Sequence, residues 1–374
     1  MSMVEWKKLG EVCKVLRGKR LTKSQLNESE GYPVLHGGST PMGYYEEFNR
    51  KANTTVVVNT GNAGCVFFYD KEFWSSDACF SLYPNKEIID KFLYLYVYGC
   101  ERILKGKIRA GAMPTIDAKA VEDLLIPIPS LSEQQRIVSI LDTFTSSISN
   151  LKQQIEERRK QYEYERDLLL DLEGKEGVEM KKLGDTLVSL KTGLNPRKNF
   201  ILNAPDGNNY YITVRELGLF DITPTEKTDK VTDEALKLIN NRSNLEVGDV
   251  LFSGTGTIGR TALIKEKPTN WNIKEGVYTL KPCKEIINSR YLTQLLHVNS
   301  TIDKIAALIV GDPIRSIPMK SLVTIPIPVP SLKTQSRIVS ILDTFEASIK
   351  NLEEQLALRE KQYEYYRNQL LTFE

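Results

Sequence analysis

Residues 124–170 read LLIPIPSLSEQQRIVSILDTFTSSISNLKQQIEERRKQYEYERDLLL, and residues 325–371 read IPIPVPSLKTQSRIVSILDTFEASIKNLEEQLALREKQYEYYRNQLL. The motif RIVSILDTF is identical in both copies, at Arg136–Phe144 and at Arg337–Phe345, and each residue of the second copy is numbered 201 higher. Similarity of this length at one fixed offset identifies a tandem duplication. Each copy follows a more divergent segment, so we expect two globular heads and two long helices.

The apolar residues of each copy recur in alternating steps of four and three, which predicts a long helix with a coiled-coil seam. The seam positions are Ile137, Leu141, Phe144, Ile148, Leu151, Ile155, Arg158, Tyr162, Glu165 and Leu169, and then Ile338, Leu342, Phe345, Ile349, Leu352, Leu356, Arg359, Tyr363, Tyr366 and Leu370. Two such stripes in one chain are most simply buried against each other, as an antiparallel pair. The alternative is that each helix packs on its own head. We interpret the two seam arginines as setting the register, since long cationic side chains can cover apolar surface.

The start of each helix is marked by proline and serine. The run Ile126-Pro-Ile-Pro is extended because proline is excluded from a helix interior, and Ser130 with Glu133 fits a capping box. The second copy keeps Ser331 but has Thr334 at the partner position, so half of that box remains. A helix from Ser132 to Leu172 would be about 60 Å long.

The heads share only short landmarks. Val4-Glu-Trp-Lys-Lys-Leu-Gly returns as Val178-Glu-Met-Lys-Lys-Leu-Gly, and Thr60-Gly-Asn-Ala-Gly returns as Thr255-Gly-Thr-Ile-Gly. Each glycine motif follows an apolar strand, expected at Thr55–Val58 and at Asp249–Ser253. We therefore predict an α+β fold: two mixed globular domains at 1–129 and 174–330, and two helices at 130–173 and 331–374 that form an antiparallel coiled coil with pseudo-twofold symmetry.

Composition narrows the class of protein. A hydrophobic fraction of 41% and a charged fraction of 26% are typical of a soluble globular chain, and no apolar run reaches the length of a membrane span. The N-terminal residues lack the apolar core of a signal peptide, so we expect a cytoplasmic protein. Five cysteines without a Cys-x-x-Cys pair, together with two histidines, favour reduced thiols and no metal site.

One motif resembles a catalytic loop. Gly254-Thr-Gly256-Thr-Ile-Gly259 fits G-x-G-x-x-G, which would bind a dinucleotide or S-adenosylmethionine if a helix began there. The next residues, Arg-Thr-Ala-Leu-Ile-Lys, favour a second strand, so we interpret the motif as a β-turn. A methyltransferase that uses this loop stays open as the enzymatic alternative.

Basic side chains cluster in loops of both heads, where they could neutralise phosphates and reach base edges. The candidate DNA-binding residues are Arg17, Lys19, Arg20, Asn62 and Arg109 in the first head, and Lys191, Arg197, Lys198, Thr257, Arg260 and Arg315 in the second. Asn62 and Thr257 are included because glycine turns permit close backbone approach to a ligand. The competing interpretation is an ordinary solvated surface.

Both copies carry the signature Pro-x-Pro-Ser-Leu-x-x-Gln-x-Arg-Ile-Val-x-Ile-Leu-Asp, which ends at Asp142 in the first copy and at Asp343 in the second. The second copy has Lys333-Thr334 before the glutamine. This signature, together with two heads and two long helices, resembles the specificity subunit of type I restriction–modification systems. The resemblance implies two target recognition domains, each of which reads one half of a split, asymmetric DNA sequence, with the helices fixing the gap. It also implies a chain without catalysis or a cofactor of its own. S-adenosylmethionine would belong to modification subunits, expected as two copies, and ATP to restriction subunits.

Partner subunits would dock on the helices, where the duplication presents the same surface twice. The exposed candidates are Gln135, Arg136, Lys160, Gln161 and Tyr164, and a plain solvated helix face is the competing interpretation. A coiled-coil adaptor that binds only proteins, and a recognition subunit of a combined cutting-and-modifying system, are further alternatives. The sequence does not specify the half-sites, the gap length or the modified base.

Overall fold

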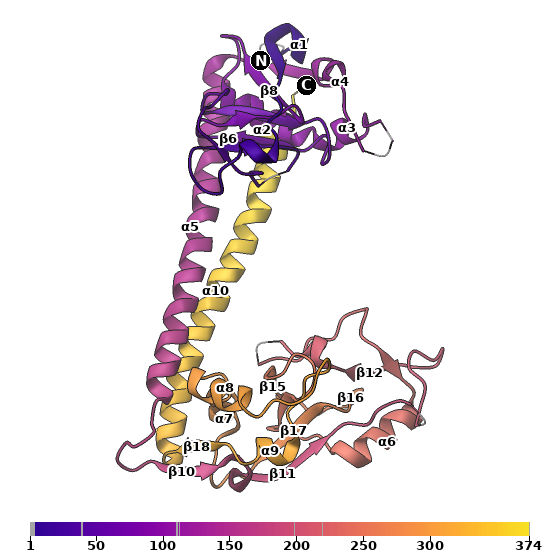
Figure 1. The fold of residues 1–374 in the computed structure, drawn as a ribbon, viewed down its shortest axis with the longest axis vertical. Coiled ribbons are helices and arrows are strands. Elements are labelled where there is room, and N and C mark those ends of the chain that lie inside the picture. The colour runs from indigo at the N-terminus through magenta and orange to yellow at the C-terminus, as the bar shows by residue number, and fades with distance from the viewer. Residues whose placement is uncertain are drawn as a thin grey trace. The chain divides into compact units, whose positions relative to one another are not determined.

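The computed structural model describes residues 4–38, 40–109, 111, 113–197, 199–218 and 220–373. The chain divides into two compact units. Unit 1 comprises Met1–Lys152 and Glu354–Glu374, and unit 2 comprises Gln153–Glu353. Each unit therefore contains one head and a part of both long helices, α5 (Leu131–Leu170) and α10 (Leu332–Leu370) (Figure 1).

Head 1, the globular part of unit 1, is built on two sheets. The larger sheet has the order β2 (Cys13–Arg17), β8 (Cys79–Pro84), β5 (Thr54–Val58), β6 (Val66–Tyr69), and all its neighbours are antiparallel. The smaller sheet has the order β4 (Tyr44–Tyr45), β3 (Tyr32–Leu35), β7 (Trp74–Ser75). The helices are α1 (Leu9–Val12), α2 (Asp90–Gly99), α3 (Glu101–Lys105) and α4 (Ala118–Glu122), with a 3₁₀ turn, η1 (Lys23–Gln25).

Head 2, the globular part of unit 2, repeats this plan. Its larger sheet has the order β11 (Leu187–Thr192), β17 (Val277–Pro282), β14 (Val250–Ser253), β15 (Thr261–Leu263). Its smaller sheet has the order β13 (Lys230–Val231), β12 (Asn209–Ile212), β16 (Trp271–Ile273). The helical elements are η2 (Leu183–Thr186), η3 (Val214–Glu216), α6 (Asp233–Ser243), α7 (Ser289–Leu295), α8 (Asn299–Ala306) and α9 (Met319–Leu322). The predicted mixed α+β heads are thus confirmed.

The two repeated motifs at the edges of the heads pair with each other. In unit 1, β1 (Glu5–Lys8) lies antiparallel to β9 (Leu125–Ile128), and in unit 2, β10 (Glu179–Lys182) lies antiparallel to β18 (Pro326–Val329). A two-stranded ribbon tolerates the prolines of the Ile-Pro-Ile-Pro run, because each strand has a free edge that needs no N–H donor. The start of each head is therefore fixed to the segment that leads into its long helix.

The long helices pair with each other in both units, as the seam predicts. In unit 1, Phe144 of α5 stacks on Tyr366 of α10 with ring centroids 5.2 Å apart, and Lys152 lies 3.0 Å from Glu360. In unit 2, Arg159 forms an ion pair with Glu353. Residue numbers rise on α5 while they fall on α10, so the pairing is antiparallel.

The seam arginines make the same contact in each unit. The guanidinium of Arg359 lies 5.7 Å from the ring centroid of Phe144 in unit 1, and that of Arg158 lies 5.9 Å from the ring centroid of Phe345 in unit 2. A guanidinium over an aromatic face is attracted to the ring while its polar edge stays in solvent. These arginines belong to the helix pairing, in line with the register role that the sequence indicates.

The first turns of each long helix also pack on the head that precedes it, so the alternative interpretation is correct for the helix starts, alongside the pairing of the helices. In unit 1, Ile137 and Leu141 are fully buried in the core of head 1, and Tyr363 and Leu370 from the end of α10 pack on the same core. In unit 2, Ile338 and Leu342 lie in the core of head 2 together with Tyr162 and Leu170 from the end of α5. Each core therefore receives the beginning of one long helix and the end of the other.

The helix starts differ from the expected capping box in one detail. Ser130 Oγ accepts from the backbone N–H of Glu133 (3.3 Å), as predicted, and Ser331 Oγ does the same for Thr334 (3.2 Å). The Glu133 carboxylate, however, accepts two hydrogen bonds from Arg136, and these bonds hold the pKa of Glu133 below its usual range. The α5 helix begins at Leu131 and ends at Leu170, two residues before the predicted end.

A buried glutamine fastens each head to its long helix. Gln134 is fully buried; its amide donates to the carbonyls of Glu87 (2.8 Å) and Pro129 (2.9 Å), and its Oε1 accepts from Ile89 N (2.9 Å). In unit 2, Gln335 forms the same three bonds, with Ile286, Pro330 and Asn288. One side chain satisfies three backbone groups that would otherwise be buried without partners.

We predict that Gln134→Ala lowers the free energy of unfolding by about 3 kcal/mol, because it leaves a buried N–H and two carbonyls without partners. Urea unfolding of the full chain measures this change. The matched control is Gln135→Ala at the exposed neighbouring position. Equal urea midpoints for the two variants would show that the buried glutamine does not hold the head to the helix.

Candidate nucleic-acid interface

A glycine turn in head 1 lies against a second loop. Gly61 (φ +88°) follows β5, and its N–H donates to the carbonyl of Pro114 at 3.3 Å. Thr115 forms isolated β-bridges with both Thr60 and Arg109. The turn at 60–62 and the described residues of the adjoining loop, Arg109 and 113–115, therefore form one surface at the end of the larger sheet.

Head 2 has the same arrangement. Gly256 (φ +78°) donates its N–H to the carbonyl of Arg315 at 3.0 Å, and Ser316 bridges to both Thr255 and Val310. The motif at 254–259 joins β14 to β15, which are antiparallel neighbours. The interpretation as a β-turn is thus confirmed. Within residues 254–264, all of which the structure describes, no helix begins where a cofactor loop requires one, so the methyltransferase alternative loses its structural basis.

The structure brings three head 1 candidates to this surface. Arg17 ends β2, and its Nε donates to the carbonyl of Asp77 (2.8 Å), which also accepts from Asn59 Nδ2, one residue before the glycine turn. Asn62 lies in the turn itself and Arg109 begins the adjoining loop, where it forms an ion pair with Asp117. All three candidates are exposed.

Three head 2 candidates meet in the same way. Thr257 is exposed in the turn, and Arg315 lies in the loop beside it. Arg260 closes the turn: its carbonyl accepts from Ser253 N, and its backbone N–H donates to Ser253 Oγ. The Arg260 guanidinium donates to the carbonyl of Val214 at 3.2 Å and thereby also supports η3. Since its guanidinium already has protein partners, Arg260 has fewer donors available for DNA than Arg315.

The other described candidates form no bond to a described residue of the two turns. Lys19 and Arg20 are exposed just after β2, where the carbonyl of Lys19 accepts from Trp74 Nε1 of the smaller sheet. Arg197 is exposed in the loop that leads to the smaller sheet of head 2, and Lys191 is half-buried on β11. Lys198 lies outside the described residues. DNA binding by these residues is not tested by the structure, so all eleven candidates stay predictions.

Sequence reasoning missed the polar junction between head 2 and α10. Arg290 Nε donates to Asp343 at 2.9 Å, and its guanidinium forms a second ion pair with Glu346 and lies 4.6 Å from the ring centroid of Phe220. In unit 1, Lys91 lies 3.8 Å from Asp142. Each head thus supplies a cation to the aspartate of the repeated RIVSILDTF motif, and the identity of that aspartate in both copies was the available signal.

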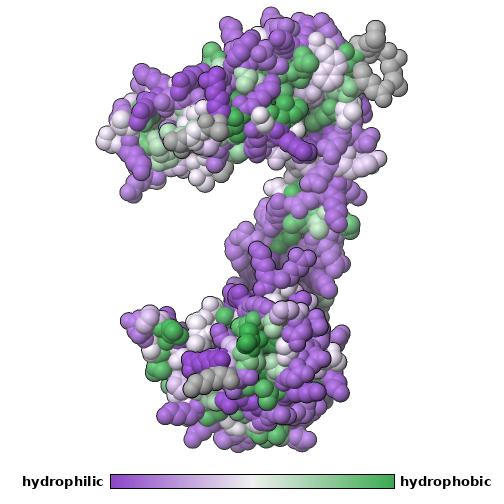
Figure 2. Space-filling view, turned by 90° about the vertical axis from the view of Figure 1, so that its right-hand side faces the viewer, coloured by the Kyte–Doolittle hydropathy of each residue, from purple (hydrophilic) through white to green (hydrophobic). Residues whose placement is uncertain are grey.

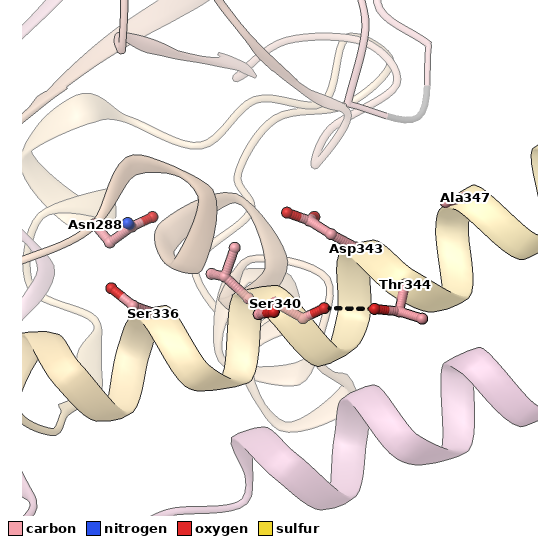
Figure 3. Close-up of a pocket in the computed structure, with 7 residues that line it drawn as sticks. Asn288, Ser336, Ser340, Asp343, Thr344 and Ala347 are labelled. Atoms are coloured by element: carbon pink, nitrogen blue, oxygen red, sulfur yellow. Dashed lines mark hydrogen bonds between the residues drawn. The ribbon is translucent and has the colours of Figure 1, made fainter.

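Beside this junction lies an open groove of about 530 Å³, lined by residues of α10 and by Asn288 of head 2. Figure 3 shows Ser336, Ser340, Asp343 and Thr344 along one side of α10, with Asn288 of the head opposite them. Ser336 is the counterpart of the candidate Gln135 on α5, which is also exposed. The groove is shallow and carries polar side chains, which suits a protein surface better than a small ligand.

The candidate docking residues on α5 are exposed, as predicted. Arg136 pairs with Glu133, Lys160 pairs with Glu156 (2.6 Å), and Gln161 accepts from Arg158 (3.1 Å). Tyr164 is 67% exposed, and its counterpart Tyr365 on α10 is 60% exposed.

Figure 2 shows hydrophilic residues over most of the visible surface of the heads and helices. In the part of the chain that the structure describes, no helix is long and apolar enough to cross a membrane.

The sequence matches the family of type I restriction modification DNA specificity domains over residues 1–158 and 175–358, and the chain belongs to this family. It is 30% identical to the specificity subunit of the type I restriction enzyme EcoR124I/EcoR124II of Escherichia coli, over 99% of this chain and 94% of that protein. It is 28% identical to a putative type I restriction enzyme specificity subunit of Haemophilus influenzae, over 100% of this chain and 96% of that protein.

Solved structures support the same fold. The crystal structure of a type I restriction–modification S subunit from M. genitalium aligns with a TM-score of 0.63 at 16% identity, over 100% of this chain and 98% of that one. A second structure, from work on the assembly and conformational transition of a type I system, aligns with a TM-score of 0.63 at 18% identity, over 99% of this chain and 98% of that one. The arrangement of two heads and two long helices is thus shared.

His297 lies at the junction of head 2 with the helices. Its Nε2 is 2.6 Å from Thr261 Oγ1, and its ring packs edge-on against Phe220. Burial, together with the guanidiniums of Arg166 and Arg290, lowers the pKa of His297 to about 4. Because the unfolded chain protonates near pH 6.5, it binds the proton more readily than the folded chain between these values.

We predict that His297 lowers the stability of the protein by about 2 kcal/mol between pH 7 and pH 5. The His297→Gln variant keeps a polar group near Thr261 and removes this titration. Urea unfolding at the two pH values should therefore show a smaller loss for the variant than for the wild type. An equal loss in both proteins would contradict the lowered pKa.

Proposed function

We propose that the chain is the DNA-recognition and scaffold subunit of a type I restriction–modification complex, in which each head reads one half of a bipartite target. The observation that carries the proposal is the same exposed surface, a glycine turn beside a loop, at the same place in both heads of a chain that belongs to the specificity family. Phosphate contacts by the basic residues would position each head, and contacts to base edges would select the sequence.

The two half-sites should differ in sequence. The turns carry Asn62 in head 1 and Thr257 in head 2, and the adjoining loops read RAGAMPT at 109–115 and VGDPIRS at 310–316. Side chains of different hydrogen-bonding chemistry select different base pairs. The scaffold is duplicated while the reading residues have diverged, which favours an asymmetric target.

The long helices fix the number of unread base pairs between the half-sites. Both helices are continuous, over 40 residues in α5 and 39 in α10, and they share a seam with matched contacts in each unit. A helix of 40 residues is about 60 Å long, and paired helices resist bending more than a flexible linker does. Specificity for spacing would therefore come from helix length.

The chain itself would be non-catalytic and would work in the cytoplasm. We place S-adenosylmethionine on two modification subunits and ATP on restriction subunits, which together would perform the chemistry. The relative from Escherichia coli is described as the specificity subunit of a restriction enzyme, which supports this division. Saturable binding of S-adenosylmethionine to the isolated chain would favour the enzymatic alternative instead.

Genome-wide mapping of methylated bases tests the function. Cells that carry this chain and its modification subunit should show a split methylated motif that disappears when the chain is removed. A motif that persists without the chain would contradict the proposal. Salt-dependent binding of the assembled complex to duplex DNA distinguishes a reader from a coiled-coil adaptor, which would show no such binding.

We predict that deleting the facing heptads Lys152–Arg158 and Glu354–Glu360 shortens the gap by about three base pairs, because seven residues span about 10.5 Å of helix and one base pair spans about 3.4 Å. The ion pair Lys152–Glu360 joins one end of the first segment to one end of the second, and the ion pair Arg159–Glu353 joins the residues that directly follow and precede them. The half-site sequences should stay unchanged in the methylation map. A matched control replaces Lys152 by alanine at unchanged helix length and should keep the gap.

The gap should also become less strict when the seam is damaged. Leu151 and Leu352 are half-buried seam residues, and a polar residue at either position weakens the pairing. An unchanged gap after the heptad deletion, with methylation still present, would contradict a spacing role for the helices.

We predict that Tyr164→Ala and Tyr365→Ala each weaken assembly with the modification subunit by about tenfold, since an exposed tyrosine often anchors an interface. Both tyrosines occupy the same place in the duplication, so each would contact one copy of the partner. The control is Leu168→Ala, which removes an exposed apolar residue (52% exposed) whose counterpart is the polar Gln369. Analytical ultracentrifugation of the mixtures measures assembly, and wild-type assembly by both tyrosine variants would exclude this docking surface.

A further inference from the structure

Each head carries an exposed apolar side chain at the tip of the loop beside its glycine turn. Met113 is 66% exposed in head 1 and Ile314 is 70% exposed in head 2. Single exposed apolar residues are common on proteins and need no explanation by themselves. These two occupy equivalent positions, 201 residues apart, in loops whose other residues have mostly changed. The recurrence of an apolar tip in two diverged heads calls for a shared role.

The stems of the two loops are held by the same backbone bonds. In head 1, Arg109 and Thr115 exchange N–H···O bonds of 2.8 and 3.4 Å, and Ile116 donates to Asn59 at 2.9 Å. In head 2, Val310 and Ser316 exchange two bonds of 2.8 Å, and Ile317 donates to Gly254 at 2.9 Å. Each stem is therefore closed by one antiparallel bridge of two backbone bonds, and a further bond ties it to the end of the larger sheet.

The surroundings of the tips favour a polyanion. The side chain of Arg315, adjacent to Ile314, is exposed and has no hydrogen bond or ion pair with any described residue, so its charge is available to a ligand. A Cβ added at Gly256 would meet nothing within 4 Å, which leaves open space at the turn. On the head 1 side, Arg17 and Arg109 are exposed at the same surface. A cationic rim around an apolar tip matches the edge of a DNA groove, with phosphates outside and bases inside.

We propose that Met113 and Ile314 are specificity-determining residues that each contact the methyl group of a thymine in the major groove, one in each half-site. The proposal deepens the proposed function and rests on it. The width of the loop stem decides the groove. Two chain segments joined by an antiparallel bridge lie about 5 Å apart, and two such segments side by side fit the major groove, about 12 Å wide, but not the minor groove, about 6 Å wide.

The chemistry of the groove decides the target group. Among the groups that the four bases present in the major groove, hydrogen-bond donors and acceptors predominate, and the C5 methyl of thymine is the apolar one. An apolar side chain at a loop tip forms no hydrogen bond with a base. It can favour binding mainly because contact with the thymine methyl removes both apolar groups from water. Each half-site should therefore contain a thymine on one strand at the position that faces the loop tip.

Deoxyuridine tests the contact, because it pairs like thymidine and lacks only the methyl group. Once the methylation map has given both half-sites, each thymine is replaced in turn in synthetic duplexes, and dissociation constants are measured for the chain assembled with its modification subunit. In each half-site one replacement should weaken binding by about fourfold, the value for one buried methyl group. Met113→Ala should abolish this sensitivity in one half-site, and Ile314→Ala in the other.

The two heads control for each other. Met113→Ala should keep full deoxyuridine sensitivity in the half-site that Ile314 reads, and the converse holds for Ile314→Ala. Met113→Leu and Ile314→Val, which keep an apolar tip, should retain most of the sensitivity. Ile103→Ala and Val188→Ala remove other exposed apolar side chains, 53% and 66% exposed, and should bind like the wild type.

Three results would overturn the proposal while leaving the proposed function intact: half-sites without thymine on either strand, site-specific binding that is insensitive to every deoxyuridine, or alanine variants that keep the wild-type sensitivity. Failure of the proposed function looks different, because the assembled complex would then bind its mapped sequence no better than random duplex DNA.

Discussion

The organisation of this protein depends on two helices of one chain that pair with each other and end in opposite heads. The core of head 1 contains Leu141 from the start of α5 and packs against Leu370 from the end of α10, and the core of head 2 contains Leu342 and Leu170 in the same roles. Neither helix could leave its partner without opening a head core, since buried apolar residues would become exposed. The seam and the cores therefore form one cooperative system in each unit.

The junctions between heads and helices explain why the repeated segment is so strictly preserved between the two copies. Its glutamine, at 134 and 335, satisfies backbone groups of the adjoining head, and its aspartate, at 142 and 343, receives a cation from that head. These bonds fix the direction in which each head meets the helix. A reader of DNA needs such a fixed direction, because side chains a few ångströms out of place no longer reach their base edges. The heads themselves are free to diverge wherever these junctions are not involved.

The sequence predicted the parts that follow from periodicity and repetition. The seam from Ile137 onward, the extended Ile-Pro-Ile-Pro run and the β-turn at Gly256 all depend on local spacing, which needs no knowledge of the tertiary fold. Sequence reasoning did not predict the burial of Gln134 or the ion pair of Arg290, because these depend on which segments meet in space. Of the candidate site, the turn at Gly61 lies against the loop that carries Arg109 in head 1, and the turn at Gly256 lies against the loop that carries Arg315 in head 2. Lys19 and Arg197 form no bond to a described residue of either turn or its adjoining loop, and a basic loop in the sequence does not reveal which sheet it joins.

The pairing of α5 with α10 is the central claim, and a distance measurement on the full chain tests it most directly. Spin labels at positions 152 and 360, which the structure joins through an ion pair of 3.0 Å, should report one short distance by electron paramagnetic resonance, as expected for helix axes about 8–10 Å apart. That distance should persist when labelled protein is diluted with unlabelled protein, because both helices belong to one molecule. A long distance, or a short one that disappears on dilution, would contradict the account.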